Sequence, residues 1–324
     1  MKTQTSKVLG LAIAAAVLLP ALVLAGATVP PQVRQRVLPQ QAKPTLVSPA
    51  SAQYRFVTID APDALLTAPY GVNNTGLVTG YYQDASGNLH GLLWRKGALK
   101  TLDNRGSVDT LLGDSSDLGM VIGNHGDATL EHAAMYDISH ALWTTLPDID
   151  NETANFGDGI NNAGVATGSA CNGNAIVGPL SNCVGWTWDE GTYSLFTAPD
   201  ADETALGTFS NGLNNRAQVV GYFQDSSAVF HGFLKDGDSF TTIDVPGAQG
   251  TFPYDINDRE EIVGEYQDAT GASHGFTESH GRFTTVDYPG ALGTSIFGNN
   301  DRGDLAGQWL DSAGTYHGFV AFKH

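Results

Sequence analysis

The sequence predicts an all-β protein whose strands recur in units of about 43 residues. Phe240–Asp244 and Phe283–Asp287 both read Phe-Thr-Thr-aliphatic-Asp, both are followed by Pro-Gly-Ala, and Phe56–Asp60 is a third version. One glycine in each copy marks the period, with spacings of 43, 45, 53, 43 and 43 residues: Gly80, Gly123, Gly168, Gly221, Gly264 and Gly307. Six copies of a β-type unit at this period indicate a radial or solenoid array.

Each copy contains four short strand patterns, which we call A to D, separated by turn residues. In the fifth copy these patterns cover about 252–257, 261–266, 273–278 and 282–287. A lone D-type pattern, Tyr54–Asp60, precedes the first copy, and the last copy ends at Phe319–Phe322 without one. We therefore predict a six-bladed β-propeller of four-stranded antiparallel blades, in which the N-terminal strand completes the last blade and closes the ring.

Composition limits the class of protein. Of the 324 residues, 39 are glycine and only 15% are charged, which argues against a coiled coil or a helical bundle. Asp and Glu number 34 against 16 Lys and Arg, for a formal charge of −18, so the chain lacks the basic surface that nucleic acid requires. A hydrophobic content of 41% excludes wholesale disorder.

The N-terminus resembles an export signal. Lys2 and Lys7 precede an apolar run from Val8 to Ala25, and Ala25-Gly26-Ala27 offers a cleavage site. We predict a signal peptide over 1–27, a Pro/Gln-rich extended linker over 28–53 and the propeller over 54–324. The protein would then be secreted or periplasmic. An uncleaved membrane anchor is the alternative for the first segment, and it would be the chain's one contact with a membrane.

The repeat also resembles a known family. The sequence Phe-Thr-Thr-Ile-Asp-x-Pro-Gly-Ala, followed by Asn-Asn/Asp-x-Gly, Ile-Val-Gly-x-Tyr, Gln-Asp-x-x-Gly and His-Gly-Phe, is similar to HAF-type bacterial extracellular repeat proteins over residues 54–324. The resemblance implies secretion and a propeller-like β fold. It supplies no established catalytic residues.

Several recurring polar residues have a structural explanation. A His-Gly pair opens strand C in four copies, and an Asp stands six residues before it, as in Asp268 and His274. Metal binding is the alternative, but equivalent positions far from an axis do not converge, so we predict an Asp–His hydrogen bond that fixes the B–C turn. Asn pairs such as Asn73-Asn74 suit the A–B turn, with sugar binding as the alternative.

Two short motifs remain. Arg302-Gly303-Asp304 is an adhesion-like tripeptide, but it occupies an A–B turn, and turn chemistry accounts for it without receptor binding. Cys171 and Cys183 frame the extra length of the third copy, which is the longest. In an oxidising compartment they predict a disulfide that closes this loop.

The candidate site lies where the A strands meet the axis. The residues ten and nine positions before each marker glycine form two sets of equivalent positions, or columns, and both columns differ between copies. From them we select the residues able to hold a ligand: Tyr70, Asp114, Asp158, Asn211, Tyr254 and Asp255. The carboxylates among them would repel one another and invite a divalent cation such as Ca²⁺, although no cofactor is firmly implied. A channel lined by residues that do not pack is the alternative. By analogy with other propellers, we expect the site on the face of the D–A and B–C loops. Since no turn requires these side chains, we expect their substitution to have little effect on stability.

The most consistent function is an extracytoplasmic binding module for a small molecule, a glycan or an envelope protein. We expect it to act as a monomer. A hydrolase, lyase or isomerase with its site over the channel is the first alternative, and a desolvated carboxyl beside a tyrosine would favour it. A purely structural envelope protein is the second. The metalloprotease motif His-Glu-x-x-His does not occur in the sequence.

Overall fold

The computed structural model describes residues 45–47, 53–127, 130–150, 152–173 and 180–324. Every regular element in these residues is a β-strand, which confirms the all-β prediction. No helix in this part of the chain is long and apolar enough to span a membrane. The predicted signal peptide, 1–27, lies outside the described residues, as does most of the predicted linker.

The strands form consecutive antiparallel groups, each a meander of four. The first group is β3 (Leu66–Val72), β4 (Val78–Gln83), β5 (Leu89–Arg95) and β6 (Ala98–Thr101). The next is β7 (Asp109–Ser115), β8 (Met120–Gly126), β9 (Glu131–Asp137) and β10 (Leu142–Thr145). Then come β11 (Ala154–Ile160), β12 (Ala166–Asn172), β13 (Ser181–Asp189) and β14 (Thr192–Phe196).

The second half of the chain continues this pattern. Its first group is β15 (Thr208–Leu213), β16 (Val219–Gln224), β17 (Phe230–Asp236) and β18 (Ser239–Ile243). The next is β19 (Gly250–Ile256), β20 (Ile262–Gln267), β21 (Ser273–Ser279) and β22 (Arg282–Thr285). These four start and end within two residues of the strands that the sequence predicts.

The last group draws its fourth strand from the other end of the chain. It consists of β23 (Gly293–Asn299), β24 (Leu305–Leu310) and β25 (Tyr316–Lys323), and β2 (Tyr54–Ile59) pairs antiparallel with β25. A three-residue strand, β1 (Thr45–Val47), pairs in parallel with the outer edge of β22. The linker prediction did not foresee β1.

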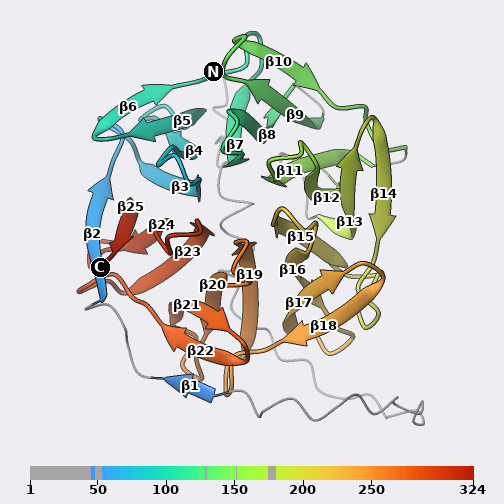
Figure 1. Cartoon of the computed structure of the whole chain (residues 1–324), viewed down its shortest axis with the longest axis vertical. Coiled ribbons are helices and arrows are strands. Elements are labelled where there is room, and N and C mark those ends of the chain that lie inside the picture. Colours follow the sequence, from blue (N-terminus) through green and yellow to red (C-terminus); the bar gives the residue numbers. More distant parts are fainter. Residues whose placement is uncertain (1–44, 48–52, 128–129, 151, 174–179) are drawn as a thin grey trace, which may run out of the picture.

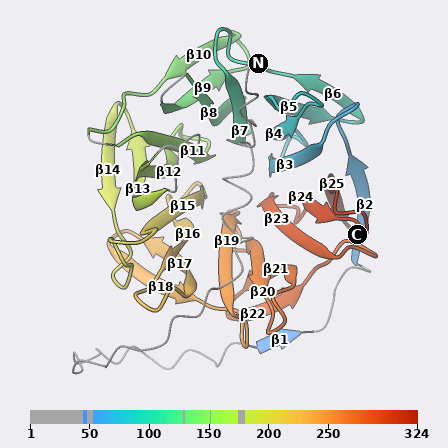
Figure 2. The same cartoon turned by 180° about the vertical axis from the view of Figure 1, so that it is seen from behind.

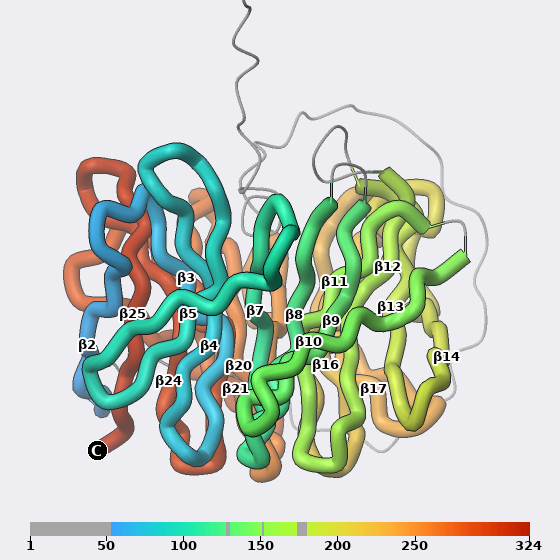
Figure 3. The backbone as a smooth tube through the Cα atoms, turned by 90° about the horizontal axis from the view of Figure 1, so that it is seen from above, coloured from blue at the N-terminus to red at the C-terminus, as the bar shows by residue number. Residues whose placement is uncertain are grey.

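The groups lie around a common centre with their first strands innermost (Figures 1 and 2). Each innermost strand contacts the innermost strand of the next group, and β23 contacts β3. Four-stranded sheets arranged radially in this way define the β-propeller architecture. Figure 3 shows neighbouring groups side by side, with turns at both ends of the strands.

The marker glycines lie where the inner two strands of a group approach closely. Gly221 on β16 pairs with Ser210 on β15, and a Cβ at Gly221 would collide with the carbonyl oxygen of Phe209. In every group the register of the innermost strand shifts directly beside this glycine, as between Ser210 and Gly212. Such a β-bulge takes one residue out of the ladder and re-aims its side chain.

Candidate functional site

The bulges place the variable columns of the sequence at the centre of the molecule. The residue out of register is Tyr70 in β3, Asp158 in β11, Asn211 in β15, Tyr254 in β19 and Phe297 in β23, whereas β7 places Gly113 and Asp114 there. The sequence columns therefore identify the residues that the backbone turns toward the axis, although the sequence does not reveal the bulge itself.

Three neighbouring groups supply an aromatic wall. Tyr70 stacks on Phe297, with ring centroids 5.1 Å apart and an interplanar angle of 11°. Tyr254 meets Phe297 edge to face at 5.0 Å. Tyr222 of β16 meets Tyr254 edge to face at 6.4 Å and extends this wall into the fourth group.

Asp158 faces this wall from the opposite side of the axis. Burial raises the pKa of its carboxyl to about 8. Burial also raises the pKa of Tyr70, Tyr81 and Tyr222, and the charge of Asp158 adds to that effect in all three. Tyr81 and Tyr222 are absent from the predicted site. They could have been found from their position in the sequence, because each directly follows a marker glycine.

The polar atoms of this cluster lack protein partners. Within the described residues, neither the Asp158 carboxyl nor the hydroxyls of Tyr70, Tyr81, Tyr222 and Tyr254 form a hydrogen bond. Tyr81, Tyr222 and Tyr254 are only 3%, 6% and 6% exposed, whereas Asp158 is half-buried. We call these five residues the axial cluster.

Asn211 and Asp255, unlike the axial cluster, form hydrogen bonds to neighbouring inner strands. The Asn211 side-chain amide donates to the Pro253 carbonyl oxygen at 2.8 Å, which ties β15 to β19. Asp255 accepts hydrogen bonds from the backbone N–H groups of Ile256 at 2.8 Å and Asn299 at 2.9 Å. Because these bonds join neighbouring inner strands, the structure predicts a loss of stability on substitution of either residue, in contrast to the expectation from the sequence.

Asp114 lies in a small cavity on the face of the A–B turns. The cavity has a volume of about 60 Å³, and its lining includes Asp114, Asn299 and the turn residues of all six copies. Burial, followed by the charge of Asp255, raises the pKa of Asp114 well above its usual range, while the backbone N–H of Ser115 donates to its carboxylate at 2.6 Å. This cavity is on the face opposite to the one expected from the sequence.

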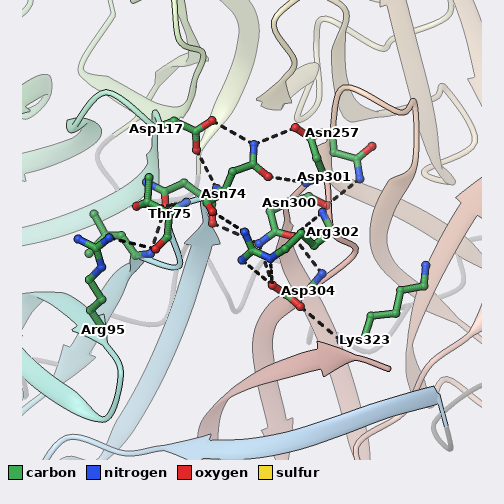
Figure 4. Close-up of polar contacts among 12 residues, drawn as sticks. Asn74, Thr75, Arg95, Asp117, Asn257, Asn300, Asp301, Arg302, Asp304 and Lys323 are labelled. Atoms are coloured by element: carbon green, nitrogen blue, oxygen red, sulfur yellow. Dashed lines mark hydrogen bonds and ion pairs between the residues drawn. The ribbon is translucent and has the colours of Figure 1, made fainter.

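The second residues of the A–B turns form a continuous circle of hydrogen bonds, which we call the turn ring. Figure 4 shows the part of it around Asn74, Asp117 and Asp301. In each turn the backbone N–H of the second residue donates to the side-chain oxygen of its counterpart in the next turn, at 2.7–2.9 Å. The members in order are Asn74, Asp117, Asn162, Asn215, Asp258 and Asp301, and Asp301 donates back to Asn74. The Asn pairs therefore stabilise their own turns, as predicted, and also join each copy to the next.

The Arg-Gly-Asp tripeptide is engaged within this region. The Arg302 guanidinium pairs with the Asp304 carboxylate at 2.7 Å and donates to the Asn74 carbonyl oxygen. Asp304 is only 5% exposed. The charged groups of the tripeptide are therefore engaged where the first and last copies meet, which agrees with the predicted structural role of this turn.

The recurring histidines each bind two aspartates. His274 Nδ1 lies 2.9 Å from Asp287 of the D-type motif, and Nε2 lies 3.5 Å from Asp268 of the B–C turn. The predicted Asp–His contact is thus present, but the nearer aspartate was missed. Burial lowers the pKa of His274, yet hydrogen bonds and the charges of Asp287 and Asp268 outweigh it and raise the pKa overall.

The disulfide and metal predictions have different outcomes. Cys171 and Cys183 form the expected disulfide, which joins β12 to β13. Across the described ranges, no group of three or more His, Cys, Asp or Glu side chains is arranged to hold a metal ion. Calcium near the axis stays a prediction.

Comparison with known proteins gives the fold class. No family model matches the chain, and no curated protein matches its sequence. A gluconolactonase from Xanthomonas campestris superposes with a TM-score of 0.52 at 14% identity, covering 94% of this chain and 99% of that one. A mutant of AofleA from Arthrobotrys oligospora gives 0.52 at 11% identity, with coverages of 83% and 86%. TolB from Acinetobacter baumannii gives 0.52 at 8% identity, with coverages of 76% and 64%. At these identities the likeness is one of fold.

Proposed function

We propose that this chain is an exported, six-bladed β-propeller of the HAF-repeat type whose ring is closed by β2 and which binds a small ligand on its axis. The repeat motif supports the family assignment, and the apolar N-terminal run and the disulfide support export.

Three contacts between the ends of the chain support closure. β2 completes the last group by pairing with β25. Asp60, directly after β2, accepts a hydrogen bond from His317 Nδ1 at 2.9 Å. The turn ring joins Asp301 to Asn74 by the same contact that joins the other copies.

The single observation that carries the binding function is the axial cluster. Its five polar groups come from four copies, have no hydrogen-bond partner among the described residues, and are not sealed from solvent. A bound molecule would therefore find free donors and acceptors there, which is why we assign the ligand to this position.

Native mass spectrometry of the protein, purified from its producing cells, tests the assignment. We expect a bound molecule in the wild type and in Asp189→Asn, an exposed control that makes the same chemical change. Asp158→Asn should lose it without a lower melting temperature, because the substitution removes a buried ionisable group. An unchanged bound mass in Asp158→Asn would overturn the axial assignment.

An enzyme is the second candidate, and one observation favours it. A carboxyl whose pKa is about 8, next to tyrosine hydroxyls, is suited to general acid–base catalysis near neutral pH. If turnover is found for any ester, lactone or glycoside, its pH profile should bend near 8 and Asp158→Asn should abolish it. Full turnover in Asp158→Asn would exclude this mechanism.

A further inference from the structure

The interior of the ring contains more than one carboxyl group. Besides Asp158, it contains Glu265 of β20, which is 3% exposed and accepts hydrogen bonds from Ser273 and Ser295 hydroxyls at 2.6 Å each. The charge of Glu265 contributes to the raised pKa of Tyr222 and Tyr254, and Tyr222 is also affected by Asp158. Among the described buried residues there is no Lys, Arg or His to balance them. Such surroundings oppose an anionic ligand.

The two carboxyls differ in what they offer a ligand. Glu265 already has two donors, whereas Asp158 has none among the described residues. Asp158 also retains accessible surface while the tyrosines around it are buried. It is therefore the group most available for contact with a ligand.

The aromatic wall adds a second feature. The rings of Tyr222, Tyr254 and Phe297 meet edge to face, at interplanar angles of 80° and 76°, so successive rings form the corners of a box rather than one flat stack. Aromatic faces arranged at right angles attract cations, and most strongly where water is excluded. A neutral polyol would be expected to find additional side-chain amides and cations, which are common partners of hydroxyl groups.

We propose that the axial ligand is a small organic cation, an alkylammonium, whose charged nitrogen lies between the Asp158 carboxylate and the aromatic box of Tyr222, Tyr254 and Phe297. This proposal rests on the proposed function, since it assumes that the ligand binds on the axis.

The proposal has a consequence for pH. An ammonium ion binds the ionised carboxylate, so binding releases a proton wherever Asp158 is protonated in the free protein. The pKa of Asp158 is about 8, and at pH 6 only about one molecule in a hundred is ionised. Affinity should then rise by about 50-fold from pH 6 to pH 8. Burial keeps the pKa of the surrounding tyrosines above this range. Burial also raises the pKa of Glu265, against its two serine donors, and raises that of Asp255, which acts on Tyr70, to about 7, so the rise is assigned to Asp158 by its loss in Asp158→Asn.

Isothermal titration calorimetry of the full chain with choline and with ethylammonium tests the proposal. The control ligand is 3,3-dimethylbutan-1-ol, which has the shape of choline without its charge. We expect at least one cation to bind, with an affinity that rises about 50-fold between pH 6 and pH 8, and the neutral alcohol to bind at least tenfold more weakly. Asp158→Asn should abolish cation binding, Tyr254→Leu should weaken it, and Tyr254→Phe, which keeps the ring, should retain it.

The outcomes separate the two proposals. Equal binding of choline and the neutral alcohol, cation binding that persists in Asp158→Asn, or no binding of either cation at tens of millimolar would overturn the cation assignment. A neutral monosaccharide such as fucose whose binding is lost in Asp158→Asn would overturn the cation assignment but retain the axial site. Binding of any of these ligands that is unchanged in both Asp158→Asn and Tyr254→Leu would overturn the axial site as well.

Discussion

Asn74 connects the first copy to the last, so its substitution measures how much the turn ring contributes to stability. Its side-chain amide donates to Asp117 at 3.0 Å and to Asp301 at 2.8 Å, and its side-chain oxygen accepts from the Asp301 backbone N–H at 2.9 Å. Asn74→Ala removes these three bonds. At about 1 kcal/mol for each, the free energy of unfolding should fall by about 3 kcal/mol. For a domain of this size, that corresponds to a fall in melting temperature of roughly 6–12 °C.

The assay is thermal and urea unfolding followed by circular dichroism, with two controls. Asn88→Ala removes an amide that donates to Asp84 within one turn, and it should cost less than about 1 kcal/mol. Asn215→Ala removes two turn-ring bonds between copies that the chain already joins covalently. We expect Asn74→Ala to exceed both, and to increase the rate of unfolding most, because its bonds with Asp301 span 227 residues. A melting temperature no lower than that of Asn88→Ala would refute this argument.

Four further predictions concern the same framework. Deleting Tyr54–Asp60 exposes an edge of β25, so the variant should aggregate or melt far lower, as measured by light scattering and calorimetry. The Cys171–Cys183 bond should be found in freshly exported protein by non-reducing mass spectrometry, and two free thiols would contradict it. His274→Ala should lower stability by about 1–3 kcal/mol; because the folded-state pKa of His274 is raised, this loss should be larger at pH 6 than at pH 9. Asp255→Ala removes two backbone contacts and should lower stability by about 2 kcal/mol, which urea titration measures.

Because the unit repeats, the secondary structure could be predicted from this one sequence. Strand patterns, turn residues and the offset of Tyr54–Asp60 recur in several copies, so an error in one copy is corrected by the others. β1 was missed because it belongs to no copy, and a three-residue strand added to an outer edge leaves no pattern of its own.

The site was predictable in part, for a physical reason. Counting from the marker glycines located Asp158 and Tyr254, because every copy places its bulge at the same distance from the glycine. Tyr81 and Tyr222 come from second strands, which a column of inner-strand residues does not capture. The roles of Asn211 and Asp255 were also missed, because a hydrogen bond to the backbone of the next copy depends on how copies pack and has no local sequence signal.

The pairing of β2 with β25 sets the order of events when the protein is made. The strand that completes the last group is synthesised before the other strands of the groups, but its partner lies more than 250 residues later, as the Asp60–His317 contact shows. Until the final strand has been synthesised, β2 has no partner in its group, and contacts between such distant segments are slow to form. Under the ring closure that we propose, each growing chain is therefore an open arc, and it closes only in one late step that requires β25.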